Sequence, residues 1–128
     1  MKKEAILCVD DESILLLSLK QTLQMHLGNE YRYETALNAE QAWKIIETLV
    51  KEQVKIIVII SDWLMPGIKG DEFLIQVHKK YPEIKAIMIT GQTTQETYDK
   101  IKNETNLVGF FLKPWKNQEL IKCIRENL

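Results

Sequence analysis

Three observations predict an α/β fold built on a parallel sheet. Short apolar runs alternate with longer segments of helical period five times along the 128 residues, which is typical of repeated βα units. The first, third and fourth runs are almost purely apolar, as expected for strands that helices cover on both faces. Polar residues stand at the ends of four runs, and open α/β sheets bind their ligands at the carboxyl ends of the strands.

The elements follow from the period of the apolar residues. We expect strands near residues 5–9, 32–36, 56–61, 85–90 and 108–112. The second of these alternates polar and apolar residues, which is typical of an edge strand. We expect Ser13 to cap the first helix and Asn38 the second. The helix within 93–104 has only Tyr98 and Ile101 as large apolar residues, so it should be the least firmly held.

Length and composition favour a single domain over residues 1–128, because 45% of the residues are hydrophobic and the chain is long enough for one core. A formal charge of −1 argues against direct binding of nucleic acid. Cys8 and Cys123 lack the spacing of a disulfide framework or zinc site, so we expect buried free thiols. The longest apolar run, 56–60, is far shorter than the ~20 residues of a membrane span. With no leader pattern either, we expect a cytoplasmic protein without membrane insertion.

Acidic, hydroxyl and basic residues stand at the ends of four predicted strands. Asp10 and Asp11 follow the first, Asp62 the third, Thr90 ends the fourth and Lys113 follows the fifth. Because the carboxyl ends of parallel strands meet at one edge, these side chains should share one pocket. Three carboxylates beside a lysine and a hydroxyl suit a divalent metal ion and a phosphoryl group.

The same residues lie in four ordered motifs: VDDE at 9–12, SDWLMPGIKG at 61–70, ITG at 89–91 and FFLKPW at 110–115. Over nearly its whole length the chain resembles a response-regulator receiver domain of two-component signalling, of the chemotaxis-receiver type. The resemblance implies a doubly wound, flavodoxin-like sheet of five parallel strands in the order 2-1-3-4-5, flanked by five helices.

The resemblance also implies the roles of the acidic residues. Asp62 matches the phosphoacceptor, whose carboxylate attacks the phosphorus of a phosphohistidine. We expect Mg²⁺ as the cofactor, with Asp11, Asp62 and the backbone carbonyl of Leu64 as direct ligands and Asp10 acting through water. Taken alone, Asp62 could equally begin a turn, and Asp11 could simply cap the first helix.

Three further residues match the family's response to phosphorylation. Lys113 would contact a phosphoryl oxygen, and the Lys113–Pro114 bond is expected to be cis. Thr90 would bind the phosphoryl group and draw its loop inward, and Phe110 would turn into the space that Thr90 leaves. An ordinary core position in a strand is a strong alternative for Phe110.

Other positions near the site bear on the lifetime of the phosphoryl group and on the docking of partners. Leu64 and Gln92 lie where the family controls access of the hydrolytic water, which predicts a phosphoryl lifetime intermediate for the family. Trp63 should report metal occupancy by fluorescence. Trp115 and Phe110 border the face of the fourth helix, fifth strand and fifth helix, a possible homodimer or partner surface, although Trp115 could equally pack under its own helix.

We therefore expect a signalling switch rather than a turnover enzyme. Its partners would be a sensor histidine kinase or phosphotransfer protein, and a downstream protein or fused output domain. A phosphorylation-independent docking module is one alternative, but all five expected polar residues of a working receiver are present. A haloacid-dehalogenase-like phosphohydrolase is another, and it fits less well because Asp10 and Asp11 are adjacent rather than separated by one residue.

Overall fold

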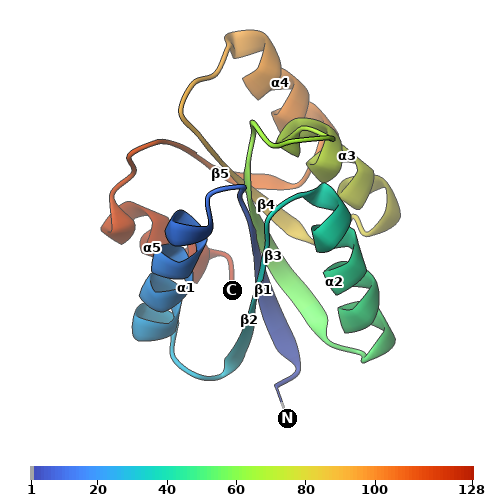
Figure 1. The fold of residues 1–128 in the computed structure, drawn as a ribbon, viewed down its shortest axis with the longest axis vertical. Coiled ribbons are helices and arrows are strands. Elements are labelled where there is room, and N and C mark those ends of the chain that lie inside the picture. The colour runs from blue at the N-terminus through green and yellow to red at the C-terminus, as the bar shows by residue number, and fades with distance from the viewer. Residues whose placement is uncertain (1) are drawn as a thin grey trace.

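The computed structural model describes residues 2–128 and forms a parallel sheet between two layers of helices (Figure 1). The strands are Glu4–Val9 (β1), Tyr31–Ala36 (β2), Lys55–Asp62 (β3), Lys85–Thr90 (β4) and Leu107–Leu112 (β5). The helices are Ser13–Leu27 (α1), Ala39–Lys51 (α2), Gly70–Lys80 (α3), Gln95–Glu104 (α4) and Asn117–Glu126 (α5). All pairings are parallel in the order β2-β1-β3-β4-β5, which confirms the predicted fold class and the edge position of β2.

Two apolar cores lie on opposite faces of the sheet. On one face α1 and α5 cover Ile6 and Ile60, and on the other α2, α3 and α4 cover Leu7 and Ile59 (Figure 1). Neighbouring residues of one strand thus enter different cores, which explains why β1 and β3 are apolar without alternation. Each fully buried aliphatic side chain contributes about 1.5–3 kcal/mol to folding.

The helix N-termini differ from one another. The Asn38 side chain accepts a hydrogen bond from the Gln41 amide at 2.8 Å, which confirms the predicted cap of α2. The prediction for α1 is wrong, because Glu12 occupies the N-cap position and Ser13 is already the first helical residue. The Glu12 amide instead donates to the Asp10 carboxylate at 2.9 Å, so an acidic residue at the sheet edge orders this turn.

Helix α4 is the most weakly buried helix. Ile101 is its one buried residue, whereas α3 buries six. Tyr98 is half-buried and packs edge-on against Phe110, with ring centroids 5.2 Å apart. This agrees with the sparse apolar pattern of the segment.

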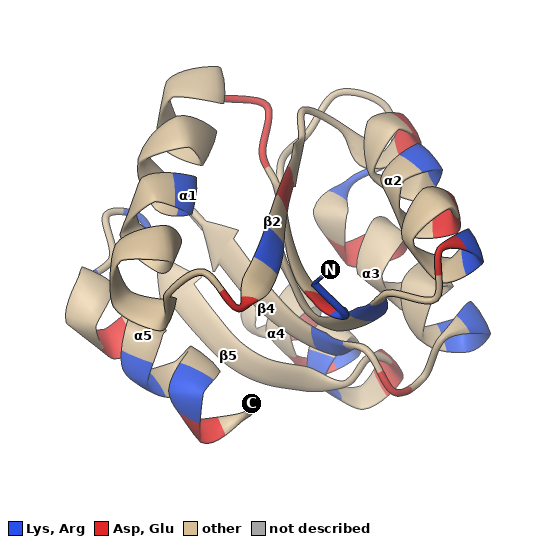
Figure 2. Ribbon diagram, turned by 90° about the horizontal axis from the view of Figure 1, so that it is seen from below, with Lys and Arg blue, Asp and Glu red and all other residues tan. Residues whose placement is uncertain are grey.

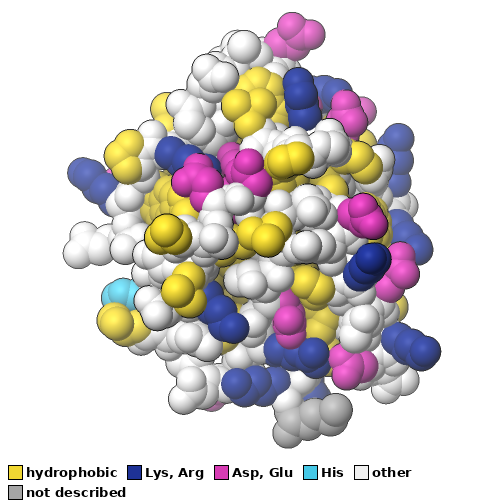
Figure 3. All heavy atoms as spheres, in the orientation of Figure 1, with side chains coloured by type: hydrophobic (Ala, Val, Ile, Leu, Met, Phe, Trp, Pro, Cys, Tyr) yellow, Lys and Arg dark blue, Asp and Glu magenta, His cyan; other side chains and the backbone are white. Residues whose placement is uncertain are grey.

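The two helical layers also differ at their surfaces. Figure 2 shows α1 almost free of charged residues, whereas α2 is banded with acidic and basic ones. The outward side of α1 exposes Ile14, Leu17 and Met25, and hydrophobic side chains reach the surface on this side of the molecule (Figure 3). Between residues 2 and 128 the structure has no helix with the length and hydropathy of a membrane span.

The two cysteines carry free thiols, as predicted. Cys8 is buried in β1, and burial raises the pKa of its thiol to about 12. Cys123 is only partly buried, and its thiol donates to the Val108 carbonyl at 3.4 Å. The expectation of complete burial is therefore correct for Cys8 and wrong for Cys123, which lies on the rim of α5.

Candidate functional site

Three carboxylates meet at the carboxyl edge of the sheet. Val9 pairs with Ser61 between β1 and β3, so the next residues, Asp10 just after β1 and Asp62 at the end of β3, lie side by side. Ligand oxygens of Asp10, Asp11 and Asp62 all lie within 4.8 Å of one another. Asp10 and Asp62 are buried and Asp11 is exposed, so the cluster opens to solvent on one side.

Lys113 reaches into this cluster from the end of β5. Its ammonium nitrogen lies 3.0 Å from Asp10 Oδ2, 3.4 Å from Asp62 Oδ2 and 3.6 Å from Glu12 Oε1. The Lys113 amide donates to the Thr90 carbonyl at 2.7 Å, which joins the ends of β4 and β5. The Lys113–Pro114 bond is cis, as expected. The structure therefore brings the predicted acidic residues and the lysine together.

The electrostatics of the cluster favour a bound cation. Burial and the nearby charge of Asp10 raise the pKa of Asp62 to about 6, although Lys113 opposes the shift. Burial also raises the pKa of Asp10. Burial lowers the pKa of Lys113, but its hydrogen bond to Asp10 and the surrounding carboxylates outweigh this and raise it. One ammonium cannot neutralise three carboxylates, and a set of carboxylate oxygens is the donor set that Mg²⁺ prefers. The residues present thus fit a magnesium ion.

The β3–α3 loop, residues 63–69, borders the cluster. Leu64 lies two residues beyond Asp62, and its side chain is 43% exposed. Trp63 is half-buried, and the ammonium of Lys69 lies 5.9 Å from the centroid of its ring. An indole so near to Asp62 is suitable for a fluorescence measurement of site occupancy.

The two predicted switch residues make other contacts. Thr90 is buried, and its hydroxyl donates to the Gln92 carbonyl at 2.5 Å, within its own loop. Phe110 is half-buried and packs on Tyr98 of α4. The structure thus places both residues near the β4–α4 loop and α4, outside the ion pairs of the carboxylate cluster.

Some residues of this edge received no role from the sequence. Glu12 stands in the first acidic motif, but its contact with Lys113 becomes visible only in three dimensions. The hydrogen bond from the Ser61 hydroxyl to the Asp62 carbonyl and the close approach of Gly70 to the Asp62 backbone are likewise visible only in the structure. Trp115 packs beside the core between α1 and α5, which supports the alternative that it lies against its own helix.

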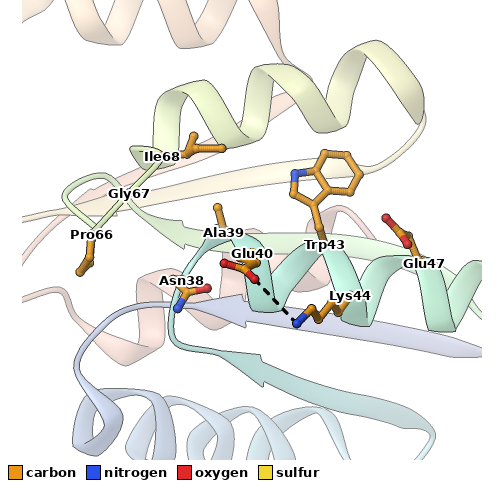
Figure 4. A pocket seen from close by; sticks show the side chains of 9 residues that line it. All are labelled: Asn38, Ala39, Glu40, Trp43, Lys44, Glu47, Pro66, Gly67 and Ile68. Atoms are coloured by element: carbon orange, nitrogen blue, oxygen red, sulfur yellow. Dashed lines mark ion pairs between the residues drawn. The ribbon is translucent and has the colours of Figure 1, made fainter.

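A hollow of about 720 Å³ lies away from the carboxylates. It lies between α2 and the β3–α3 loop, and Figure 4 shows Trp43 rising from α2 toward it, with Pro66 and Ile68 on the loop. Its one ion pair joins Glu40 and Lys44 at 3.7 Å. Trp43 also packs edge-on against Phe73 of α3, with ring centroids 5.9 Å apart. The candidate site is therefore the acidic edge rather than this hollow.

Comparisons with known proteins identify the family of the chain. The family model of the response regulator receiver domain matches residues 6–125. The hydrogenase transcriptional regulatory protein HoxA of Cupriavidus necator is 35% identical over 125 residues, which are 98% of this chain and 24% of that protein. A chemotaxis protein CheY homolog of Campylobacter jejuni is 32% identical over 126 residues, covering 96% of this chain and 91% of that protein.

A solved structure gives the same result. The signal receiver domain of an HD domain-containing protein from Pseudomonas fluorescens Pf-5 superposes with a TM-score of 0.86 at 27% identity, covering 98% of this chain and 94% of that chain. Receiver domains of this kind are, as a family, regulatory phosphoacceptor domains. The chain belongs to the response regulator receiver domain family of two-component signalling, for which a phosphorylated aspartate and Mg²⁺ are typical. It spans about a quarter of the length of HoxA.

Proposed function

We propose that residues 1–128 form one receiver domain that acts as the phosphoacceptor switch of a two-component phosphorelay. A sensor histidine kinase or a phosphotransfer protein supplies the phosphoryl group, and Asp62 accepts it. One observation carries the proposal: the Lys113 ammonium lies 3.0 Å from Asp10 and 3.4 Å from Asp62, within a cluster of three carboxylates. This arrangement combines a nucleophile, a metal-binding donor set and a cation for the transferred group.

Asp62 is the proposed nucleophile. One of its carboxylate oxygens forms a bond to phosphorus while the bond from phosphorus to the donor's imidazole nitrogen breaks, and the electron pair remains on that nitrogen. With a pKa of about 6, the carboxylate is mostly ionised at neutral pH and can attack. Lys113 is close enough to donate a hydrogen bond to a phosphoryl oxygen on Asp62.

Asp11, Asp62 and the backbone carbonyl of Leu64 are the proposed direct ligands of Mg²⁺, and Asp10 would act through a water molecule. When bound, the ion supplies positive charge that offsets repulsion between the carboxylates and the incoming phosphoryl oxygens. Asp11 is the exposed member of the cluster, so the site is accessible to the ion and to a phosphodonor from solvent.

Thr90 and Phe110 are the proposed switch. The Thr90 hydroxyl would exchange its bond to the Gln92 carbonyl for one to a phosphoryl oxygen, and Phe110 would leave Tyr98 and turn inward. Phosphorylation can shift the population only if its contacts are better in the active state, and the Thr90 and Lys113 contacts provide that difference.

The face of α4, β5 and α5 is the proposed output surface. It would be read by a downstream protein, by an output domain outside this chain or by a second copy, rather than by direct contact with nucleic acid. Leu112 is exposed at the end of β5, next to Lys113. Sedimentation of the protein with and without phosphorylation would decide whether this face forms a homodimer.

Intact mass after incubation with acetyl phosphate tests the function. We expect a gain of one phosphoryl group that requires Mg²⁺, is absent from Asp62→Asn and persists in Asp99→Asn, a control at an exposed position of α4. No gain in folded protein that binds Mg²⁺ would contradict the proposal and favour a docking module. Continued release of inorganic phosphate from small phosphate esters would instead support the phosphohydrolase.

A further inference from the structure

The backbone of Asp62 has a crowded neighbour in the first residue of α3. A Cβ atom built on Gly70 would lie 1.9 Å from the Asp62 carbonyl oxygen and 2.8 Å from its carbonyl carbon. It would also lie 3.0 Å from the Cα of Trp63. All three atoms belong to the backbone, so no side-chain rotation could relieve the overlap.

Two hydrogen bonds act at the same place. The Gly70 amide donates to the Trp63 carbonyl at 2.7 Å, which closes the β3–α3 loop at its base. The hydroxyl of Ser61, which is fully buried, donates to the Asp62 carbonyl at 3.0 Å. The peptide that follows the acceptor carboxylate is therefore held from two sides, by Ser61 within β3 and by Gly70 from α3.

The closed loop also carries a proposed metal ligand. Leu64 lies within residues 63–69, between the two points at which the loop is fastened. A change in the distance between Gly70 and Asp62 would displace the loop and the acceptor together, because both share this backbone contact. Errors of ~1 Å in the position of a reacting group lower rates by up to about 100-fold.

We propose that Gly70 and Ser61 are positioning residues of the phosphoacceptor site, which set where the Asp62 carboxylate and the Leu64 carbonyl meet the metal ion. Neither residue touches the reacting atoms. Gly70 acts because it has no side chain, and Ser61 acts through its hydroxyl. The inference rests on the function proposed above and extends it to residues outside the acidic cluster.

The main test is Gly70→Ala, with Mg²⁺ affinity read from Trp63 fluorescence in folded protein. We expect at least a 10-fold loss of affinity and a similar loss in the maximal rate of phosphorylation at saturating Mg²⁺. The concentration of acetyl phosphate that gives half the maximal rate should change less than 2-fold. A lower maximal rate with an unchanged half-maximal concentration indicates that the acceptor carboxylate is displaced while acetyl phosphate still binds. General destabilisation of the fold does not produce this combination.

Two glycines provide matched controls. A Cβ on Gly109 would lie 2.7 Å from the Cys123 sulfur, so Gly109→Ala introduces crowding between β5 and α5, away from the acidic edge. A Cβ on Gly91 would meet nothing within 4 Å, so Gly91→Ala is a neutral change at the same edge of the sheet. Both variants should bind Mg²⁺ as the wild type does, even if Gly109→Ala unfolds at a lower temperature.

The second test isolates the Ser61 hydroxyl and does not depend on Gly70→Ala folding. Thr and Val have nearly the same shape, so Ser61→Thr and Ser61→Val add equal bulk, and only Thr keeps the donor. We expect Ser61→Thr to bind Mg²⁺ at least 3-fold more tightly than Ser61→Val. Equal affinities in this pair, or wild-type affinity in folded Gly70→Ala, would overturn the inference. Failure of the wild type to bind Mg²⁺ or accept phosphate would instead overturn the proposed function.

Discussion

The two loops next to β3 and β4 are built differently. The β3–α3 loop is closed by the Gly70–Trp63 hydrogen bond and leads into α3, which buries six residues. The β4–α4 loop leads into α4, which buries only Ile101. The first loop follows the proposed acceptor and the second follows Thr90. The proposed acceptor is therefore next to firm structure, and the residue proposed to move is next to weakly held structure.

This difference suits a two-state device. A switch requires two arrangements that differ by only a few kcal/mol, and elements with little buried surface change arrangement at the lowest cost. The Tyr98–Phe110 contact is the main aromatic packing between α4 and the sheet, so it is the natural place for such a change. The acidic cluster, in contrast, gains from rigidity because metal ligands and a nucleophile act only in a narrow geometry.

The largest expected effect is on stability, when one aromatic residue is truncated in α3 and one in α4. Phe73 of α3 is fully buried, and Phe73→Ala should lower the free energy of unfolding by about 3–5 kcal/mol through the cavity it leaves. Tyr98 of α4 is half-buried, so Tyr98→Ala should cost only about 1 kcal/mol. Urea unfolding of the two variants measures both. Equal losses would mean that α4 is held as firmly as α3.

The next effect on stability comes from the buried negative charge of Asp62, the proposed acceptor. The folded-state pKa of Asp62 is about 6, above its ordinary value of 3.8, so ionisation of this side chain opposes folding. The penalty is complete above pH 6 and disappears as the pH falls below 3.8. Without metal, Asp62→Asn should therefore raise the free energy of unfolding by about 3 kcal/mol at pH 7.5, since one pKa unit corresponds to about 1.4 kcal/mol.

Thermal unfolding at several pH values and Mg²⁺ concentrations would measure this gain. The stability difference should shrink toward pH 4, where the wild-type carboxyl becomes protonated. It should also shrink when Mg²⁺ is added, because the ion would stabilise the wild type more than a variant that lacks one of its proposed ligands. A gain that is independent of both pH and Mg²⁺ would show that charge at Asp62 is not its origin.

Much of the fold followed from the sequence because its signals are local. Buried parallel strands are continuous apolar runs, and the predicted strands differ from the observed ones by at most one residue at either end. The Asn38 cap was predictable because cap and partner lie three residues apart. Ser13 was predicted wrongly because the turn before α1 is ordered by Asp10, a residue of the acidic edge, rather than by a helix cap.

Only part of the candidate site could be predicted from the sequence. Asp10, Asp62 and Lys113 could be brought together because the carboxyl ends of parallel strands share one edge. That Lys113 lies nearer to Asp10 than to Asp62 depends on side-chain distances that no spacing along the chain encodes. The close approach of Gly70 to Asp62 is likewise hidden, because it depends on how α3 packs against the end of β3.

A smaller effect should separate metal binding from the switch. Thr90→Val removes the hydroxyl that bonds to the Gln92 carbonyl and keeps nearly the same volume. Mg²⁺ affinity should stay within 2-fold of the wild type, because the Thr90 hydroxyl bonds within its own loop and takes no part in the ion pairs of the carboxylate cluster. The increase in protection of α4 amides that we expect on phosphorylation, measured by hydrogen exchange, should be lost.

Thr93→Val is the matched control, since Thr93 is exposed in the same loop. It should retain both Mg²⁺ binding and the phosphorylation response. If Thr90→Val responds like the control, the switch does not pass through the Thr90 hydroxyl. If it loses Mg²⁺ affinity instead, the two loops are coupled in the resting state, and the contrast between a firm and a movable loop would be wrong.

The smallest effect concerns hydrolysis of the acyl phosphate. The exposed Leu64 side chain cannot orient a water molecule, whereas Gln92 of the movable loop can, and the two together predict a lifetime intermediate for the family. Leu64→Asn should shorten the lifetime several-fold, because an amide on the firm loop would hold the attacking water in place. Gln92→Ala should lengthen it by a similar factor. Decay of the phosphoprotein, followed by intact mass after removal of acetyl phosphate, measures both. An unchanged rate in Leu64→Asn would mean that water is positioned from the movable loop alone, so the firm loop would control formation of the acyl phosphate but not its loss.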